Sequence, residues 1–285
     1  MTTLYEVSSF TYNGHGGNLA GVRLLAPEEE LLPAEMQGIA ADLGYSETAF
    51  VKRTNERKFH LRYFTPLAEV PLCGHATIAA FSLLKQLAQL TAGTYGMETL
   101  AGHLSIKISQ DETVFMEQPL PIFYDDQPNT QQVANSLGLV ASDFADNYPL
   151  KIVSTGLKDL MIPLKNSQLL EKISPDFKAI SLISETLDII GYHVFAVEDN
   201  QLTINCRNFA PYVGIDEEYA TGTSNGALAC YLFQETRTDD TSYEFKQGRQ
   251  TLDQSGQIFV KLTATDRHLK QVLVGGKAVI SKRLN

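Results

Sequence analysis

Two segments of this chain, residues 75–90 and 223–234, would be apolar around nearly their whole circumference if they were helical. They begin HATIAAFSLL and TSNGALACYLF. A helix without a polar face must be buried on every side. Each segment lies in its own half of a chain of 285 residues, a length typical of about two domains. The pattern therefore predicts two units, each built around one central helix.

Short apolar runs rich in Val, Ile, Phe and Tyr surround these segments and are separated by turn residues, which is typical of strands. The first half has such runs at residues 4–10, 21–25, 49–52, 59–64, 104–108 and 114–117. The second half has them at 151–154, 161–164, 192–197, 202–206, 258–263 and 271–274. Helical spacing predicts further helices at 33–43, 130–137 and 177–187. Many strands around one buried helix, twice, indicate sheets that curl.

The predicted fold class is therefore α+β, with two pseudo-symmetric domains. Each domain is expected to be a curved, mostly antiparallel or mixed, barrel-like sheet wrapped around a central buried helix. The Pro- and Asp-rich stretch near residues 118–126 is the expected boundary. Aligning 74–84 with 222–232 gives three identical positions, at Gly74/Gly222, Ala79/Ala227 and Leu84/Leu232, which fits a duplication without proving it.

Composition excludes several classes of partner. Lys+Arg 23 against Asp+Glu 33 gives a net charge of −10, so the chain lacks the basic surface of a nucleic-acid-binding protein. The most apolar stretch, residues 76–84, is much shorter than the roughly 20 residues of a membrane-spanning helix. The N-terminus lacks the features of a signal peptide, and three cysteines are an odd number, so we expect reduced thiols and a cytoplasmic location. Without a CxxC or HExxH spacing, no metal site is expected.

Both predicted buried helices begin with small residues, CGHAT at 73–77 and TGTSN at 221–225. The first turn of a helix offers free backbone N–H groups, and glycine lets a ligand approach the backbone. Two such helix starts facing one cleft would hold a carboxylate. The alternative is ordinary capping by Thr and Ser side chains.

Candidates for chemistry are few. Glu47 stands just before an apolar strand, where it is either functional or a solvated turn residue. Cys73 begins a helix, which lowers the pKa of a thiol, so it is either a nucleophile or a small apolar filler. Cys230 is expected in the core, and the acidic group 216–218 is expected to be a solvated turn. These patterns alone indicate a cleft enzyme without defining its reaction.

Several longer motifs carry a resemblance. They are NLAGV at 18–22, LGYSETAF at 43–50, RYFTP at 62–66, Glu69 with CGHAT at 73–77, and RNFAP at 207–211 followed by ATG at 220–222. In this order they resemble the family of phenazine-biosynthesis (PhzF-like) isomerases. The resemblance implies a diaminopimelate-epimerase-like fold and a homodimer. It also implies an N-terminal domain of residues 1–118 plus about 275–285, a C-terminal domain of 119–274, and an active site in the cleft between them.

The resemblance also assigns roles to residues. It implies that Glu47 is the catalytic acid/base and His75 a second catalytic group. Glu218 stands where the family has an aspartate that assists catalysis, one methylene shorter, and Tyr219 replaces the proline that follows. The residues expected to bind the substrate are Asn18, Ser46, Cys73, Gly74, Gly222 and Thr223.

The function expected from this resemblance is a cofactor-independent isomerase. Glu47 would move a proton on a small cyclic or conjugated carboxylate. One alternative is an amino-acid epimerase or racemase, whose relatives use a cysteine at each helix start. Here Cys73 occupies one start and Thr221 the other, so the two-thiol mechanism lacks a partner. A second alternative is a non-catalytic protein that binds a small carboxylate.

Overall fold

The computed structural model describes residues 3–196, 203–236, 239–249 and 251–284. Contacts divide the chain into two compact units. Unit 1 consists of Met1–Glu117 and Gly275–Asn285, and unit 2 consists of Gln118–Val274.

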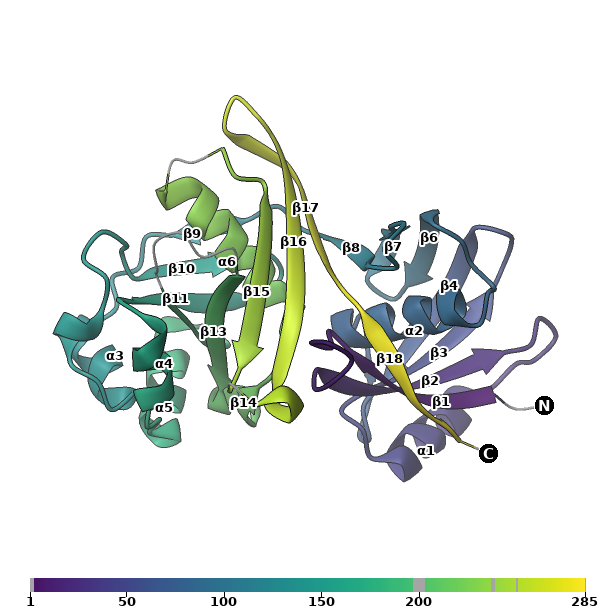
Figure 1. The fold of residues 1–285 in the computed structure, drawn as a ribbon. Coiled ribbons are helices and arrows are strands. Elements are labelled where there is room, and N and C mark those ends of the chain that lie inside the picture. Colours follow the sequence, from purple (N-terminus) through teal and green to yellow (C-terminus); the bar gives the residue numbers. More distant parts are fainter. Residues whose placement is uncertain (1–2, 197–202, 237–238, 250, 285) are drawn as a thin grey trace. The chain divides into compact units, whose positions relative to one another are not determined.

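Unit 1 is a curved mixed sheet with one helix inside it (Figure 1). Its strands pair in the order β18-β1-β2-β3-β4-β6-β7-β8, with β5 beside β4. The pairs β2–β3 and β4–β6 are parallel and the others are antiparallel. Helices α1 (Pro33–Leu43) and α2 (Gly74–Gln86) make the two crossovers. The strands are β1 (Thr3–Ser9), β2 (Asn18–Leu25), β3 (Thr48–Arg53), β4 (Lys58–Phe64), β5 (Glu69–Val70), β6 (Gly93–Thr99), β7 (Gly102–Ile108), β8 (Val114–Gln118) and β18 (Ala278–Leu284).

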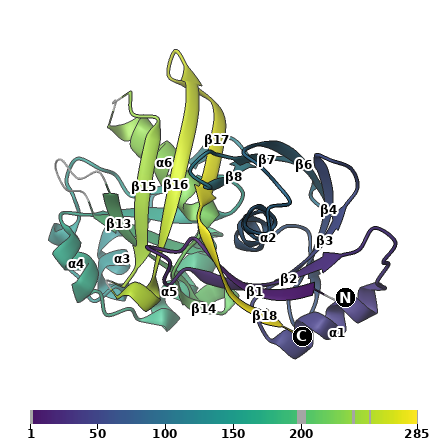
Figure 2. The ribbon, with the colours of Figure 1, turned by 45° about the vertical axis from the view of Figure 1, so that its right-hand side comes forward.

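Helix α2 is the centre of unit 1, as the all-apolar pattern predicts. Every residue from 76 to 84 is buried. Figure 2 looks nearly along this helix, with strands of the unit arranged around it. The helix ends at Gln86 rather than at 90, because Ala88 adopts a left-handed conformation (φ 57°) and the N–H of Gln89 bonds to the carbonyl of Leu84.

Unit 2 repeats this plan. Its sheet runs β9-β10-β11-β12-β13-β15-β16, with β14 beside β13, and the pairs β11–β12 and β13–β15 are parallel. Helices α4 and α5 contact β12 and β13, and α6 contacts β10, β11 and β16. The helices are α3 (Thr130–Ser136), α4 (Ser167–Lys172), α5 (Phe177–Leu187) and α6 (Gly222–Glu235). The strands are β9 (Ile122–Tyr124), β10 (Lys151–Ser154), β11 (Lys158–Leu164), β12 (Gly191–Ala196), β13 (Thr203–Ala210), β14 (Ile215–Glu218), β15 (Ser242–Gly248) and β16 (Ser255–Thr265), and β17 (His268–Gly276) leads back to unit 1.

Helix α6 is buried as completely as α2. Every residue from 224 to 233 is buried, including the polar Ser224 and Asn225. The connections in unit 2 match those in unit 1: antiparallel pair, parallel crossover, antiparallel hairpin, then a second parallel crossover that contains the buried helix. The predicted α+β fold with two pseudo-symmetric halves is confirmed.

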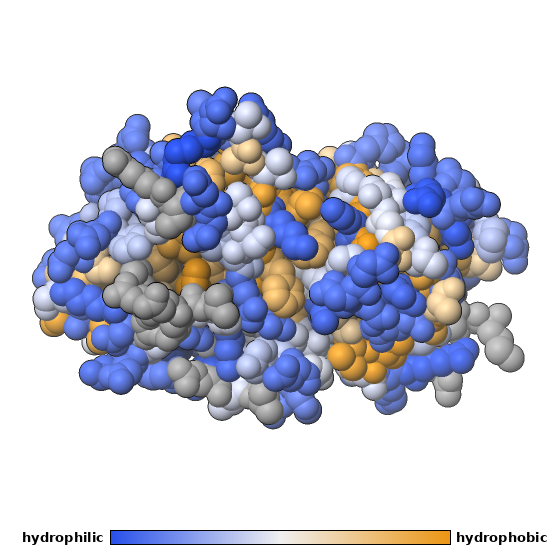
Figure 3. All heavy atoms as spheres, turned by 45° about the horizontal axis from the view of Figure 1, so that its top comes forward, coloured by the Kyte–Doolittle hydropathy of each residue, from blue (hydrophilic) through white to orange (hydrophobic). Residues whose placement is uncertain are grey.

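Some elements escape the sequence prediction. Strand β6 contains two glycines, and β15 is mostly polar, so neither forms an apolar run. The short elements β5, β9, β14 and α4 were also not predicted. Val197 and Leu202, at the ends of two expected strands, lie outside the described residues. No helix within the described ranges is long and apolar enough to cross a membrane. On the face drawn in Figure 3, hydrophilic side chains cover most of the surface of each unit.

Candidate functional site

Glu47 is held at the start of β3 by its backbone. Gly44 closes α1 in a left-handed conformation (φ 68°), with its N–H bonded to the carbonyl of Ala40. The carbonyl of Glu47 then accepts a 3.1 Å hydrogen bond from Gly21. A Cβ on Gly21 would lie 2.7 Å from the hydroxyl of Thr48, so only glycine fits where β2 and β3 begin to pair.

The side chains of Ser46, Glu47, Cys73 and His75 meet at the N-terminus of α2. His75 Nε2 lies 3.2 Å from Glu47 Oε2 and 3.4 Å from Ser46 Oγ. Cys73 Sγ lies 3.5 Å from His75 Nδ1. The side chains of Glu47 and His75 are 22% and 12% exposed, so both are shielded yet reachable from solvent. Asn18, the first residue of β2, lies on the neighbouring strand, where its carbonyl accepts from Ser9 Oγ.

Burial lowers the pKa of His75, and the negative charge of Glu47 opposes this shift. The imidazole is therefore neutral at neutral pH, with one ring nitrogen as donor and the other as acceptor. A carboxylate beside a neutral imidazole can accept a proton from a third group.

The starts of both buried helices lack side-chain caps. In the described structure, neither N-cap residue, Cys73 or Thr221, makes a cap hydrogen bond into its helix. The alternative of ordinary capping by the N-cap side chains is therefore wrong, and it does not explain why both helices begin with small residues. Gly74 and Gly222 are the first residues of α2 and α6, where first-turn N–H groups can bind an anion. Thr223 follows Gly222, and its carbonyl accepts a 2.9 Å hydrogen bond from Thr155 Oγ1.

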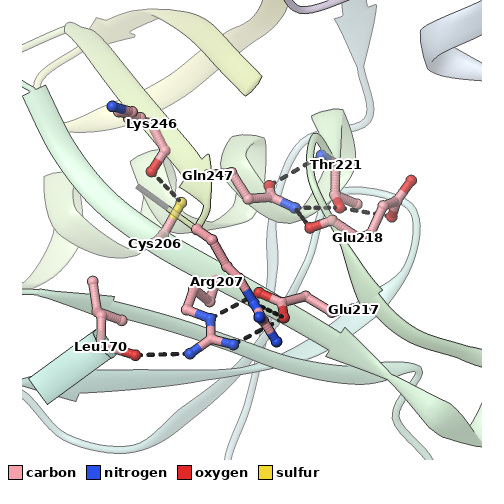
Figure 4. Close-up of polar contacts among 9 residues, drawn as sticks. Leu170, Cys206, Arg207, Glu217, Glu218, Thr221, Lys246 and Gln247 are labelled. Atoms are coloured by element: carbon pink, nitrogen blue, oxygen red, sulfur yellow. Dashed lines mark hydrogen bonds and ion pairs between the residues drawn. The ribbon is translucent and has the colours of Figure 1, made fainter. Parts of the chain in front are cut away.

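Glu218 lies at the end of β14, next to the start of α6. Its Oε2 accepts a 2.7 Å hydrogen bond from Thr221 Oγ1 (Figure 4). The buried side chain of Gln247 fixes this turn: its Nε2 donates to the Glu218 carbonyl at 2.6 Å, and its Oε1 accepts from the Thr221 N–H at 3.0 Å. Gln247 was not predicted, because a single glutamine in a polar strand gives no signal.

The neighbouring Glu217 is a structural residue. Arg207 binds it with two hydrogen bonds of 2.7 and 2.8 Å, and Arg207 Nη1 also donates to the Leu170 carbonyl (Figure 4). The two side chains are 4% and 9% exposed. The prediction that 216–218 is a solvated turn is therefore wrong for Glu217 and Glu218, and only Asp216 is exposed.

The same arrangement occurs in unit 1. Arg62 binds Glu69 with hydrogen bonds of 2.6 and 2.7 Å. Each arginine also lies over the phenylalanine two residues further on, at 5.2 Å in unit 1 and 4.9 Å in unit 2. Thus RYFTP at 62–66 and RNFAP at 207–211 are equivalent segments, each followed by a glutamate five residues before the first glycine of the buried helix.

A buried polar network lies against the first turn of α6. Ser224 Oγ donates to Asp159 Oδ2 at 2.5 Å. Asn208 Nδ2 lies 3.2 Å from both Ser224 Oγ and His193 Nδ1. Burial raises the pKa of Asp159 to about 7, opposed by the Ser224 hydrogen bond and assisted by the negative charge of Glu218. Burial lowers the pKa of His193 to about 3.

Among the described residues, this network occurs in unit 2 and has no counterpart in unit 1. Asp159 begins the β11–β12 pairing, and the equivalent residue of unit 1 is Gly21, which begins the β2–β3 pairing. In place of Asn208, unit 1 has Tyr63, whose hydroxyl lies 2.6 Å from Thr77 Oγ1. Asp159 Oδ1 and His193 Nε2 have no hydrogen-bond partner among the described residues. The signal in the sequence was a charged residue opening the apolar run 159–164.

Glu47, Cys73 and His75 could also hold a metal ion. Their ligand atoms lie within 4.8 Å of one another, and within the described ranges this is the one such group of three or more.

Comparisons place the chain among known proteins. The sequence pattern of the phenazine biosynthesis-like protein family (PhzC-PhzF) matches residues 7–283. An uncharacterized isomerase of Clostridium acetobutylicum is 35% identical, with 97% of this chain and 95% of that protein covered. The uncharacterized isomerase YddE of Escherichia coli K12 is 34% identical, with the same coverage of 97% and 95%.

A solved structure supports this placement. The Bacillus anthracis phenazine biosynthesis protein of the PhzF family superposes with a TM-score of 0.87 at 28% identity, covering 99% of this chain and 98% of that one. The motifs, the fold of two similar halves and these matches agree over nearly the whole length. The chain belongs to the phenazine biosynthesis-like (PhzC-PhzF) family.

Proposed function

We propose that this protein is a cofactor-independent isomerase that moves a proton on a small cyclic or conjugated carboxylate, with Glu47 as the acid/base. The observation that carries the proposal is the position of the Glu47 carboxylate, 3.2 Å from a shielded, neutral His75 at the start of α2. The isomerase names of the two bacterial relatives support the reaction class.

Glu47 takes a proton from an activated carbon and returns it to another position of the conjugated system. A positioned acid/base group of this kind contributes about 10²–10⁴-fold to a rate. Neutral His75 acts as the second catalytic group, because its N–H can donate to the Glu47 carboxylate or to charge that develops on the substrate.

The uncapped helix starts bind the substrate carboxylate. Gly74 in α2, and Gly222 with Thr223 in α6, supply backbone N–H groups at the positive ends of their helices. Ser46 and Cys73, which both contact His75, and Asn18 complete the proposed binding residues.

Glu218 assists the proton transfer. Its side chain is one methylene longer than aspartate, and the hydroxyl of Thr221 binds its carboxylate. This hydrogen bond also speaks against an epimerase with a group at each helix start, because Thr221 is used as a donor to Glu218 and is not a base.

The test is solvent deuterium exchange into a panel of small cyclic carboxylates, followed by NMR, with binding measured in parallel by calorimetry. Glu47→Gln is nearly isosteric but cannot carry the proton, so exchange should fall at least about 100-fold while binding persists. Glu98→Gln, an exposed glutamate of unit 1, is the matched control and should exchange like the wild type. Equal exchange by Glu47→Gln and wild type overturns the role of Glu47. Binding without exchange by the wild type favours the non-catalytic alternative.

We also propose that the protein is a homodimer, as the family resemblance implies. Sedimentation velocity at micromolar concentration should give a single dimeric species. A monomer under these conditions contradicts the proposal.

A further inference from the structure

We propose that Cys73, His75 and Glu47 form a binding site for Zn²⁺ in unit 1. They supply a thiolate, an imidazole and a carboxylate, the three kinds of side chain that bind zinc in proteins. They come from the turn before β3 and from the start of α2, two segments whose backbones are fixed by hydrogen bonds to β2 and within α2.

The distances between the ligand atoms match those of a tetrahedral site. With zinc bonds of ordinary length, a ring nitrogen and a carboxylate oxygen stand about 3.4 Å apart, and a sulfur and a nitrogen about 3.6 Å apart. The observed separations are 3.2 Å between His75 Nε2 and Glu47 Oε2, and 3.8 Å between Cys73 Sγ and His75 Nε2. Small side-chain rotations would therefore bring all three atoms to one ion.

Charge balance also favours a divalent cation. The thiolate and the carboxylate carry two negative charges, which neutralise Zn²⁺, while the imidazole binds as a neutral ligand. On binding, the sulfur–zinc bond replaces the S–H bond of Cys73, and the proton passes to solvent. Three protein ligands leave the fourth position of a tetrahedral ion open to water.

The chain provides matched thiol controls. Cys230 is fully buried, and Cys206 Sγ donates to Asn225 Oδ1 at 3.4 Å. Within the described residues, neither belongs to a group of three metal-ligating side chains.

A consequence that rests on the proposed function is that zinc bound at this site inhibits the enzyme. The ion occupies the carboxylate oxygen of Glu47 that would accept the substrate proton, so the metal-bound form lacks a free base. The site therefore makes the proposed isomerase sensitive to zinc and its activity recoverable with a chelator.

The experiment measures metal binding directly, independently of turnover. The tag-free full chain is titrated with Zn²⁺ alone against a chromophoric chelator. Wild type should bind one ion per chain. Cys73→Ala should lose at least about 100-fold in affinity, more than the 10–100-fold that loss of an outer-shell partner costs. Cys230→Ala should bind like the wild type, and circular dichroism verifies that each variant is folded.

A second measurement identifies the sulfur ligand. Co²⁺ should give a thiolate-to-cobalt charge-transfer band in wild type and Cys230→Ala, and none in Cys73→Ala. Failure of the wild type to bind stoichiometric Zn²⁺, or unchanged affinity in Cys73→Ala, overturns the site. The wild type can bind Zn²⁺ stoichiometrically and through Cys73 yet exchange deuterium into no carboxylate. That result supports the zinc site and contradicts the proposed isomerase function.

Discussion

Arg207 and Glu217 are joined by two parallel hydrogen bonds, 2.7 Å from Nε to Oε1 and 2.8 Å from Nη2 to Oε2. The pair connects β13 to β14 just before the chain enters α6. Arg62 and Glu69 connect β4 to β5 in the same way before α2. A planar guanidinium can bind both carboxylate oxygens at once, which a lysine ammonium cannot. The two pairs therefore hold together the strands that lead into each buried helix.

Arg207→Lys should lower the free energy of unfolding by about 3 kcal/mol, the low end for breaking a buried ion pair. The loss arises because Glu217 stays buried with a poorer partner and the Leu170 carbonyl loses its donor. Arg62→Lys should cost less, because its pair is 21% and 22% exposed and water can compensate. Urea denaturation of both variants measures the difference. Equal losses would show that burial does not set the strength of these pairs.

Asp159→Asn should change how stability depends on pH. Folding raises the pKa of Asp159 from 3.8 to about 7, so the folded protein holds a proton that the unfolded chain releases, and stability falls as pH rises from about 4 to 7. Asparagine keeps an acceptor for Ser224 Oγ and does not titrate. The variant should match the wild type near pH 4 and exceed it above pH 7 by up to about 4 kcal/mol, at about 1.4 kcal/mol per pKa unit. Urea titrations at several pH values measure this, and parallel curves would contradict the prediction.

His193→Gln should change the stability of the protein at acidic pH. Folding lowers the pKa of His193 from 6.5 to about 3, so the unfolded chain takes up a proton that the folded protein does not, and stability is lost as pH falls from about 6.5. Glutamine still offers an oxygen to Asn208 Nδ2 but does not titrate. Relative to wild type, the variant should gain stability by a few kcal/mol between pH 7 and pH 4. A difference independent of pH would mean that folding does not shift the pKa of His193, and would contradict the prediction.

Thr221→Val should weaken the proposed reaction without removing Glu218. Valine keeps the shape of threonine but loses the hydroxyl that donates to Glu218 Oε2. Hydrogen bonds to charged groups contribute about 1.5–3 kcal/mol, so turnover should fall by about 10- to 100-fold. Thr186→Val, an exposed site on α5, is the control. Unchanged deuterium exchange in Thr221→Val would exclude this hydrogen bond from catalysis.

Cys73→Ser should keep deuterium exchange within about tenfold of the wild type, because the proposed base is a carboxylate. A loss of about 1,000-fold, the scale expected for deletion of an essential catalytic group, would instead favour a thiol mechanism. NMR with the same substrates compares the two proteins.

The sequence predicts the two central helices well because a helix that is apolar all round has one physical solution, complete burial. It predicts β6 and β15 poorly, because glycine and polar residues hide a strand whose stability comes from its neighbours. Neither strand can be predicted from the local pattern of apolar residues alone.

The candidate site depends on contacts between distant segments. Spacing does not place Glu47 beside His75, and only the family resemblance suggested it. Asp159, His193 and Asn208 come from β11, β12 and β13, so their network exists only once the sheet has formed. The role of Glu217 can be predicted from the sequence, because aligning RYFTP with RNFAP, and the first glycines of the two buried helices with each other, places Glu217 opposite Glu69 and Arg207 opposite Arg62.

The repeated Arg–Glu pairs stabilise the segments before α2 and α6, and they lie outside the first turns that carry the proposed site residues. The pairs join residues 62 and 69 in unit 1 and residues 207 and 217 in unit 2. The first turns of α2 and α6, at 74–77 and 222–225, contribute no residue to these pairs. The backbone of a helix start can therefore keep its course while the side chains on it are exchanged. The two halves of this chain differ in this way: one helix start carries His75, and the other carries Ser224, whose hydroxyl donates to the buried Asp159. A scaffold of this kind can acquire new substrates by substitutions in a single turn, which makes these short segments the places to redesign.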